Sequence, residues 1–155
     1  ATDYLIIGDD VRRETAKIAR AVNSLTTFPE NGKEDWSRIK IVEGMDLISY
    51  YLRTTIENEY LGRYPNTYDN KQILVTAISD YFRYLERTGV LSAGESYAEV
   101  DYERQLLWLT DQGVDTSGMT RKEILEYQTG SWVFIRCGGR LVDAMEDFEV
   151  LFNNL

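Results

Sequence analysis

The feature that most constrains the fold of this chain is a pair of amphipathic stretches with a helix-breaking segment between them. Apolar residues recur at steps of three and four in each stretch, which is the spacing of one face of an α-helix. They are Ile41, Met45, Ile48, Leu52 and Ile56 in the first stretch, and Leu74, Ile78, Tyr81 and Leu85 in the second. The sequence therefore predicts two helices that pack through these faces.

The ends of these helices are marked by residues that cap or break a helix. Asp35 is suited to cap the first helix, Gly62 is a typical helix stop, and Pro65 prevents simple continuation. The second helix is predicted over residues 69–88, and Gly89 ends it.

The N-terminal segment is predicted to hold a strand followed by a helix. Residues 4–7 form a short apolar run, which is typical of a strand, and Asp9 or Asp10 then offers an N-cap. The apolar spacing over residues 11–25 is helical, with Thr15 in a gap of the stripe.

Between the helix pair and the C-terminus, the sequence predicts a loop and two short helices. Residues 92–98 have a loop-like composition, and residues 101–111 favour a short helix or a mixed segment. The sequence "TRKE" at residues 120–123 matches a capping box, in which threonine and glutamate satisfy each other's backbone amides. We expect this box to open a short helix that Gly130 closes.

Two runs of β-forming residues close the chain, at residues 132–137 and 148–152. Two strands alone make a marginal sheet in water, so these strands either pack on the helices as an intramolecular hairpin or pair with strands of another chain. The whole pattern predicts an α+β fold, in which several amphipathic helices pack with a small antiparallel sheet and the chain ends in a strand hairpin or arm.

Composition excludes several classes of function. The 155 residues fit one domain, with an apolar fraction of 43% that is sufficient for a core. A net charge of -9, from 26 acidic and 17 basic residues, argues against nucleic acid and anionic membranes as ligands. No apolar run reaches the length of a membrane span, so no membrane insertion is expected.

The sequence offers little for catalysis, metal binding or cofactor binding. It contains no histidine, and its single cysteine, Cys137, lies in a strand-like run where a buried structural thiol is expected. No phosphate-binding loop or dinucleotide fingerprint is present. The stretch "DQGVDTSGMTRKE" resembles a calcium loop, but it places Gly113 and Ile124 at positions that need oxygen ligands. We therefore expect no catalytic residues, no metal and no cofactor.

Pairs of acidic residues leave a weak alternative, a hydrolase that uses two carboxylates. The pairs are Glu57 with Glu59, Glu146 with Asp147, and Asp143 with Asp147. Chance pairs are expected among 26 acidic residues, so a solvated acidic surface is the simpler interpretation.

Several stretches, taken in order, resemble the C-terminal inner domain of contractile tail sheath proteins. These are "NSLTTF", "YLGRYPN", "YLERTGVL" and "DAMED", and the similarity covers nearly the whole chain. Such proteins build the sheaths of long-tailed phages and phage-like bacteriocins. They are much longer than this chain and carry an N-terminal arm and outer domains, so the resemblance implies a fragment or a trimmed form.

The resemblance also implies a use for the C-terminal strands. In such sheaths, terminal arms complete a small sheet in a neighbouring subunit, and this strand pairing persists while rigid bodies turn during contraction. We expect residues 1–146 to form the core of the inner domain and residues 147–155 to form the arm. The expected strand-pairing residues are Val133, Ile135 and Cys137 in the internal strand, and Phe148, Val150 and Phe152 in the arm.

The leading hypothesis is thus a non-enzymatic subunit of a contractile sheath, which polymerises with copies of itself around a tail tube protein. Its expected further partners are baseplate and tail terminator proteins. Its expected location is the tail of a virion or phage-like particle, assembled in the cytoplasm of the bacterial host. The alternative is a helical adaptor or connector protein of a tail or other assembly, which an acidic surface and tyrosine-rich helices would also suit.

Overall fold

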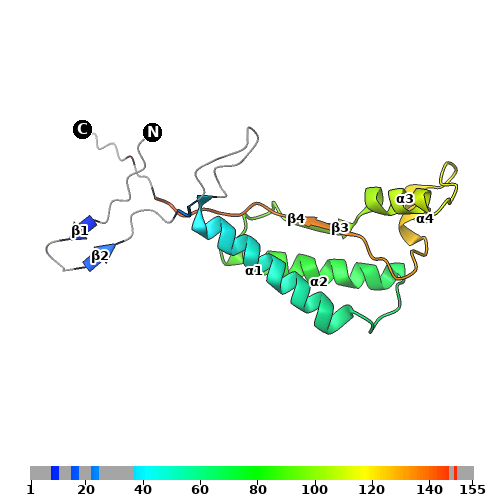
Figure 1. Cartoon of the computed structure of the whole chain (residues 1–155), viewed down its shortest axis with the longest axis horizontal. Coiled ribbons are helices and arrows are strands. Elements are labelled where there is room, and N and C mark those ends of the chain that lie inside the picture. Colours follow the sequence, from blue (N-terminus) through cyan, green and yellow to red (C-terminus); the bar gives the residue numbers. More distant parts are fainter. Residues whose placement is uncertain (1–7, 11–14, 18–21, 25–36, 147–148, 150–155) are drawn as a thin grey trace. The chain divides into compact units, whose positions relative to one another are not determined.

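The computed structural model describes residues 8–10, 15–17, 22–24, 37–146 and 149 of the chain (Figure 1). The chain divides into two compact units, Ala1–Leu47 with Asp143–Leu155, and Ile48–Val142. The boundary falls within helix α1 (Ile39–Thr55), so this helix contributes residues to both units.

Helix α1 confirms the first predicted helix and ends in an unusual turn. The helix begins at Ile39, whereas the proposed cap Asp35 lies outside the described residues. One π-helical turn, η2 (Ile56–Tyr60), follows α1 directly. Gly62 then adopts a φ of 71°, a left-handed conformation that favours glycine, so the predicted helix stop is confirmed.

Helix α2 (Tyr68–Arg87) confirms the second predicted helix almost to the residue. Its N-cap is Thr67, whose side-chain oxygen accepts a hydrogen bond from the amide of Asn70 at 3.3 Å. Gly89 follows the helix end with a φ of 75°. Both ends of α2 are thus set by local residues, as helix capping requires.

The buried face of α2 forms the centre of the Ile48–Val142 unit. The buried residues of this central cluster are Leu74, Ile78, Phe82 and Leu85 of α2, with Leu91 beyond the helix end. The half-buried side chains around them are Ile48, Leu52, Tyr60, Tyr81, Val90, Ala98, Ile135, Cys137 and Leu141. Three side chains of the cluster, those of Phe82, Leu85 and Leu91, are only 2% exposed. Burial of one such side chain contributes about 1.5–3 kcal/mol to folding.

Strands β3 (Tyr97–Val100) and β4 (Ile135–Gly138) form an antiparallel pair in the same unit. β3 packs against α2. β4 confirms a strand near residues 132–137, but the loop predicted over residues 92–98 is wrong at its end, where β3 begins. Turn-forming residues just before β3 hide this four-residue strand, and its partner lies far away in the sequence.

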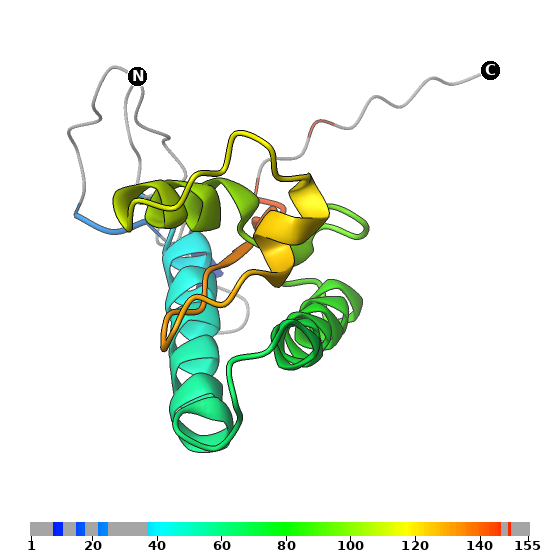
Figure 2. The same ribbon diagram turned by 90° about the vertical axis from the view of Figure 1, so that its right-hand side faces the viewer.

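Helices α3 (Tyr102–Asp111) and α4 (Arg121–Glu126) lie next to each other, as Figures 1 and 2 show from two directions. The predicted capping box opens α4: the Thr120 amide donates to Glu123 Oε2 at 2.7 Å, and the Glu123 amide donates to Thr120 Oγ1 at 3.3 Å. α4 ends at Glu126, because Tyr127 is already extended, so Gly130 does not close it as predicted.

The N-terminal helix predicted over residues 11–25 is wrong at its described residues. Strands β1 (Gly8–Asp10) and β2 (Thr15–Lys17) pair antiparallel, and Val22 forms a bridge with Arg38. The helical spacing rested on a few apolar residues around the β-branched Thr15, and pairing with β1 satisfies the backbone instead. The strand predicted at residues 4–7 lies outside the described residues.

Together these helices and small antiparallel sheets confirm the predicted α+β class. Among the helices of the described residues, none combines the length and the apolarity that a membrane span requires.

A buried polar network lies between α2 and the α3–α4 segment. Lys71 is 3% exposed, and its ammonium donates to Gln105 Oε1 at 3.2 Å and to Thr129 Oγ1 at 3.3 Å. None of the ion pairs within the described residues involves Lys71. Burial lowers the pKa of Lys71, because the charged amine loses its hydration.

We predict that truncating the central cluster destabilises the fold strongly, whereas truncating the exposed side of the same helix does not. Leu85→Ala should lower the free energy of unfolding by about 2–5 kcal/mol, because it leaves a cavity. Ile73→Ala is the matched control: Ile73 is 55% exposed, and its loss should cost about 0.5 kcal/mol or less. Urea unfolding measures both, and equal losses would contradict the assignment of the core.

We also predict that Lys71 makes stability rise with pH on the alkaline side. Its pKa is lowered in the folded state, so the unfolded chain binds more protons as the pH approaches the ordinary lysine pKa of about 10.4. Stability is therefore lost as the pH falls through this range toward the folded pKa. The difference in unfolding free energy between wild type and Lys71→Met isolates this contribution, and a pH-independent difference would refute it.

Candidate subunit interface at the sheet edge

The outer edge of β4 is the surface that best fits pairing with another strand. In the part of the chain that the structure describes, β4 pairs with β3 alone, and β3 is the strand that packs against α2. The two-stranded sheet thus has one face covered by the helical core and leaves the edge of β4 without a strand partner among these residues.

The register of the pair decides which backbone groups of β4 face outward. The Asp101 amide donates to the Phe134 carbonyl at 2.9 Å, which makes these two residues a hydrogen-bonded pair. Hydrogen-bonded and non-hydrogen-bonded pairs alternate along an antiparallel ladder, and Ile135 and Cys137 stand opposite Val100 and Ala98 as the non-hydrogen-bonded pairs. The amides and carbonyls of Ile135 and Cys137 therefore point away from β3.

The predicted strand-pairing residues have different surroundings. Ile135 and Cys137 pack their side chains against the central cluster, and this burial raises the pKa of the Cys137 thiol. Val133, just before β4, is 42% exposed. The side chains of Ile135 and Cys137 are thus used in the core, and their backbone groups are what remains for a strand partner. Phe148, Val150 and Phe152 lie outside the described residues.

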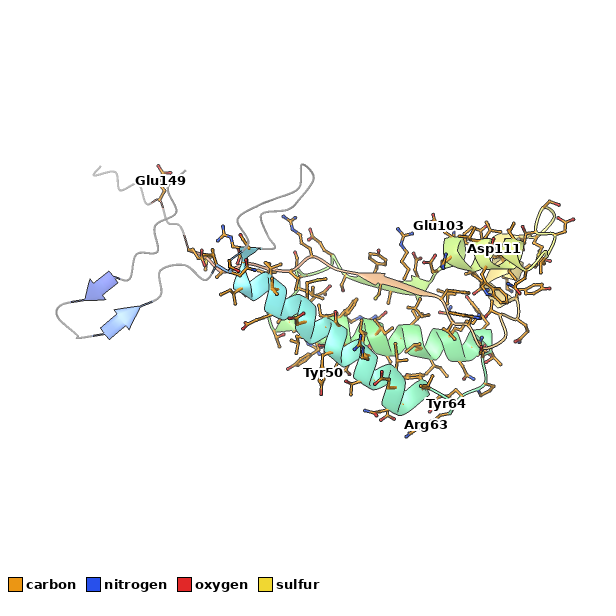
Figure 3. The ribbon with its side chains drawn as sticks, in the orientation of Figure 1. Tyr50, Arg63, Tyr64, Glu103, Asp111 and Glu149 are labelled. Atoms are coloured by element: carbon orange, nitrogen blue, oxygen red, sulfur yellow. The ribbon has the colours of Figure 1, made fainter. Side chains whose placement is uncertain are left out.

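The face of the sheet away from the core carries aromatic and charged side chains. Trp132 and Phe134 stack with ring centroids 6.2 Å apart, and Trp132 is 59% exposed. Arg136 forms an ion pair with Glu103 at 3.5 Å. Glu103 lies in the first turn of α3 and is labelled in Figure 3. At the end of β4, the Tyr97 ring covers Gly138 so closely that an added Cβ would lie 2.9 Å from it.

The segment that precedes the C-terminal residues is fixed by an ion cluster in the other unit. Arg38 Nη1 lies 2.8 Å from Glu146 Oε2, and its Nε lies 3.5 Å from Asp143 Oδ2. The side chain of Glu146 is only 12% exposed, and that of Arg38 is 29% exposed, so water screens this cluster incompletely. It ties residues 143–146 to the start of α1.

Of the predicted acid pairs, only Glu57 with Glu59 lies entirely within the described residues, and it is not enclosed as a hydrolase site would be. Glu57 and Glu59 are exposed on η2, and Glu59 lies 3.8 Å from Arg63. Asp143 and Glu146 both pair with Arg38, and Asp147 lies outside the described residues. A small apolar pocket lies elsewhere, lined by Tyr51, Leu52, Thr55, Ile56, Leu74, Ala77 and Ile78.

Sequence reasoning missed both β3 and the Arg38 cluster. The sequence of β3 carries only a weak signal for a strand, because Ala98 and Val100 are apolar at a spacing of two within four residues. The Arg38 cluster carried no comparable signal, because Arg38 is separated from Asp143 by most of the chain.

Comparisons with known proteins identify the family. Residues 32–153 match the family described as the phage tail sheath C-terminal domain. The tail sheath protein of Clostridium phage phiCD119 is 37% identical over 134 residues, which cover 86% of this chain and 37% of that protein. A chain in the cryo-EM structure of the anti-feeding prophage (AFP) baseplate matches with a TM-score of 0.55 and 16% identity, over 97% of this chain and 35% of that one.

The chain thus spans little more than a third of each of these two proteins. The match to the family nevertheless covers most of the chain, and it agrees with the ordered stretches that resembled sheath proteins. This chain belongs to the phage tail sheath C-terminal domain family.

Proposed function

We propose that this chain acts as a structural, non-enzymatic part of a contractile tail sheath, which polymerises through strand pairing between copies. The observation that carries the proposal is the outward-facing backbone of β4 in a chain of the sheath family. An edge of this kind binds an extended segment through main-chain hydrogen bonds, while alternate side chains set the register.

We propose residues 147–155 as the arm that pairs with such an edge on a neighbouring copy. Phe148, Val150 and Phe152 alternate, as do Ile135 and Cys137 on β4. With these apolar side chains toward the core, Glu149 projects to the outer face, which is the face that carries Arg136. A cross-strand pair of opposite charge favours one register over others.

The Arg38 cluster supports this arrangement. Because Arg38 holds Asp143 and Glu146, the chain is anchored immediately before the proposed arm. An anchored base lets the arm leave its own copy from a fixed point, which lowers the entropy lost when it pairs elsewhere.

The proposed partners are further copies of this protein, the tail tube protein that the sheath surrounds, and the baseplate and tail terminator proteins at its ends. The proposed location is the tail of a virion or phage-like particle, with assembly in the cytoplasm of the bacterial host. Contraction would turn subunits against one another while the strand pairs persist.

We predict that Val133→Pro, made in the native gene, disrupts sheath assembly without unfolding the domain. In the proposed pairing the amide of Val133 donates to the arm of a neighbouring copy; proline removes this amide, and an edge position tolerates proline. One lost hydrogen bond of about 1 kcal/mol weakens each association step about fivefold. Val133→Thr keeps the amide and the β-branched shape, so it should assemble normally. Electron microscopy of tails and sedimentation of the polymer measure both, and normal sheaths with Val133→Pro would refute this use of the edge.

Charge reversal tests the proposed register, in which Arg136 of one copy stands opposite Glu149 of another. Arg136→Glu should weaken assembly because it places two carboxylates opposite each other, and adding Glu149→Arg should restore it. Failure of the double variant to recover, with both single variants folded, would reject this register alone. A defined complex with one other protein, and no polymer, would instead favour an adaptor.

A further inference from the structure

We propose that helices α3 and α4 form a module that swings as one body on the β3–β4 pair, and that Lys71, Asn66 and Thr129 form the latch that holds the module against the N-terminal end of α2. This inference concerns motion within the Ile48–Val142 unit and does not depend on the sheath function.

The two chain connections to the module lie side by side, which is the geometry of a hinge. The chain leaves β3 at Asp101 and returns toward β4 at Phe134, and the Asp101 amide donates to the Phe134 carbonyl at 2.9 Å. Trp108 packs on Phe134 at the same place, with ring centroids 6.3 Å apart. Rotation of a few residues at the ends of β3 and β4 therefore carries everything between them.

The module has an interior of its own. Leu109 of α3 is fully buried and Ile124 of α4 is 2% exposed, whereas the residues packed on the central cluster include none between positions 101 and 134. Gln105 Nε2 donates to the carbonyls of Ile124 and Leu125, and the Arg121 guanidinium lies 4.5 Å from the ring centroid of Tyr102. These contacts join α3 to α4 and remain intact when the module moves away from α2.

The contacts between Lys71 and the module are hydrogen bonds in which Lys71 can only be the donor. The Gln105 amide nitrogen is used within the module, so only its Oε1 remains to accept from Lys71 Nζ, at 3.2 Å. The Thr129 hydroxyl donates to the Trp132 carbonyl, so it can only accept from Lys71, at 3.3 Å. Lysine has no acceptor group when charged and suits both positions.

Asn66, in the connection before α2, completes the latch. Its Nδ2 donates to Thr129 Oγ1 at 3.1 Å and to the carbonyls of Gly130 and Trp132, each at 2.8 Å. Its Oδ1 is buried and has no hydrogen-bond partner among the described residues. That orphaned oxygen and the buried Lys71 ammonium would both gain water when the module opens. Water also replaces the other latch bonds at little net free energy, so opening competes closely with closure.

Hydrogen–deuterium exchange of the full chain tests the latch with Thr129→Val, which keeps the side-chain shape and removes the hydroxyl. The amides of α3 and α4 should exchange about tenfold faster, and by a common factor, because the closed state loses a shared acceptor and the open module, without the support of α2, unfolds locally as one unit. The amides of residues 74–85 in α2 should change less than about twofold. Thr129→Ser keeps the hydroxyl and should behave as wild type.

A second variant protects the test against a folding defect at the buried Thr129. Asn66 lies in a half-buried connection, and Asn66→Ala removes the two N–H donors that three latch acceptors share, so it should give the same pattern of exchange. Equal acceleration in α2 and in the module would mean global destabilisation and would overturn the proposal. So would separate responses of α3 and α4, or no response in either variant.

Discussion

The apolar face of α2 is the constraint on which the rest of the described structure depends. Two strands of four residues each are too small to be stable alone, and they gain stability by packing on a helix. Ala98, Ile135 and Cys137 provide that packing against the α2 cluster. The same packing covers one face of the sheet, and the outer edge of β4 has no strand partner among the described residues.

In this arrangement, the side chains and the backbone of β4 have different roles. Ile135 and Cys137 use their side chains for their own core, while their outward amides and carbonyls remain available. Backbone recognition alone is not specific, since any extended segment can provide it. In the proposed strand pairing, specificity would come from the outer face of the sheet, where Arg136 and the exposed Trp132 lie.

Local signals made much of this fold predictable, and long-range pairing limited the rest. The two long helices and the Thr120–Glu123 box follow from residues within a few positions of one another, so the sequence was sufficient. β3 and β2 were missed because pairing with another segment, rather than local spacing, decided their conformation.

The predicted strand-pairing residues also show what the sequence alone could not decide. Strand alternation predicted that Val133, Ile135 and Cys137 share one side of a strand, but the sequence does not say whether such a side faces a core or a partner. The position of α2 assigns the side chains of Ile135 and Cys137 to the core, whereas Val133 lies outside β4 and is exposed. Lys71 gave no signal at all, because a lysine in an amphipathic helix is ordinarily exposed.

Polar contacts occupy the junctions of the described structure, whereas apolar contacts occupy its centre. Arg38 pairs with carboxylates at the base of the C-terminal segment, and Lys71 bonds to neutral acceptors where α2 meets the α3–α4 module. The two junctions differ in how the positive charge is balanced. Carboxylates neutralise the charge of Arg38, whereas the acceptors around Lys71 are uncharged.

The difference predicts different mechanical behaviour. Separating Arg38 from the carboxylates of Asp143 and Glu146 breaks attractive ion pairs and gains little, so that junction favours the closed state. Opening the Lys71 contact rehydrates an uncompensated ammonium, which offsets the hydrogen bonds that are lost. An apolar core cannot open in this way without losing its packing. A protein that must keep its fold while its parts turn is therefore better served by polar joints around an apolar centre, which is the distribution found here.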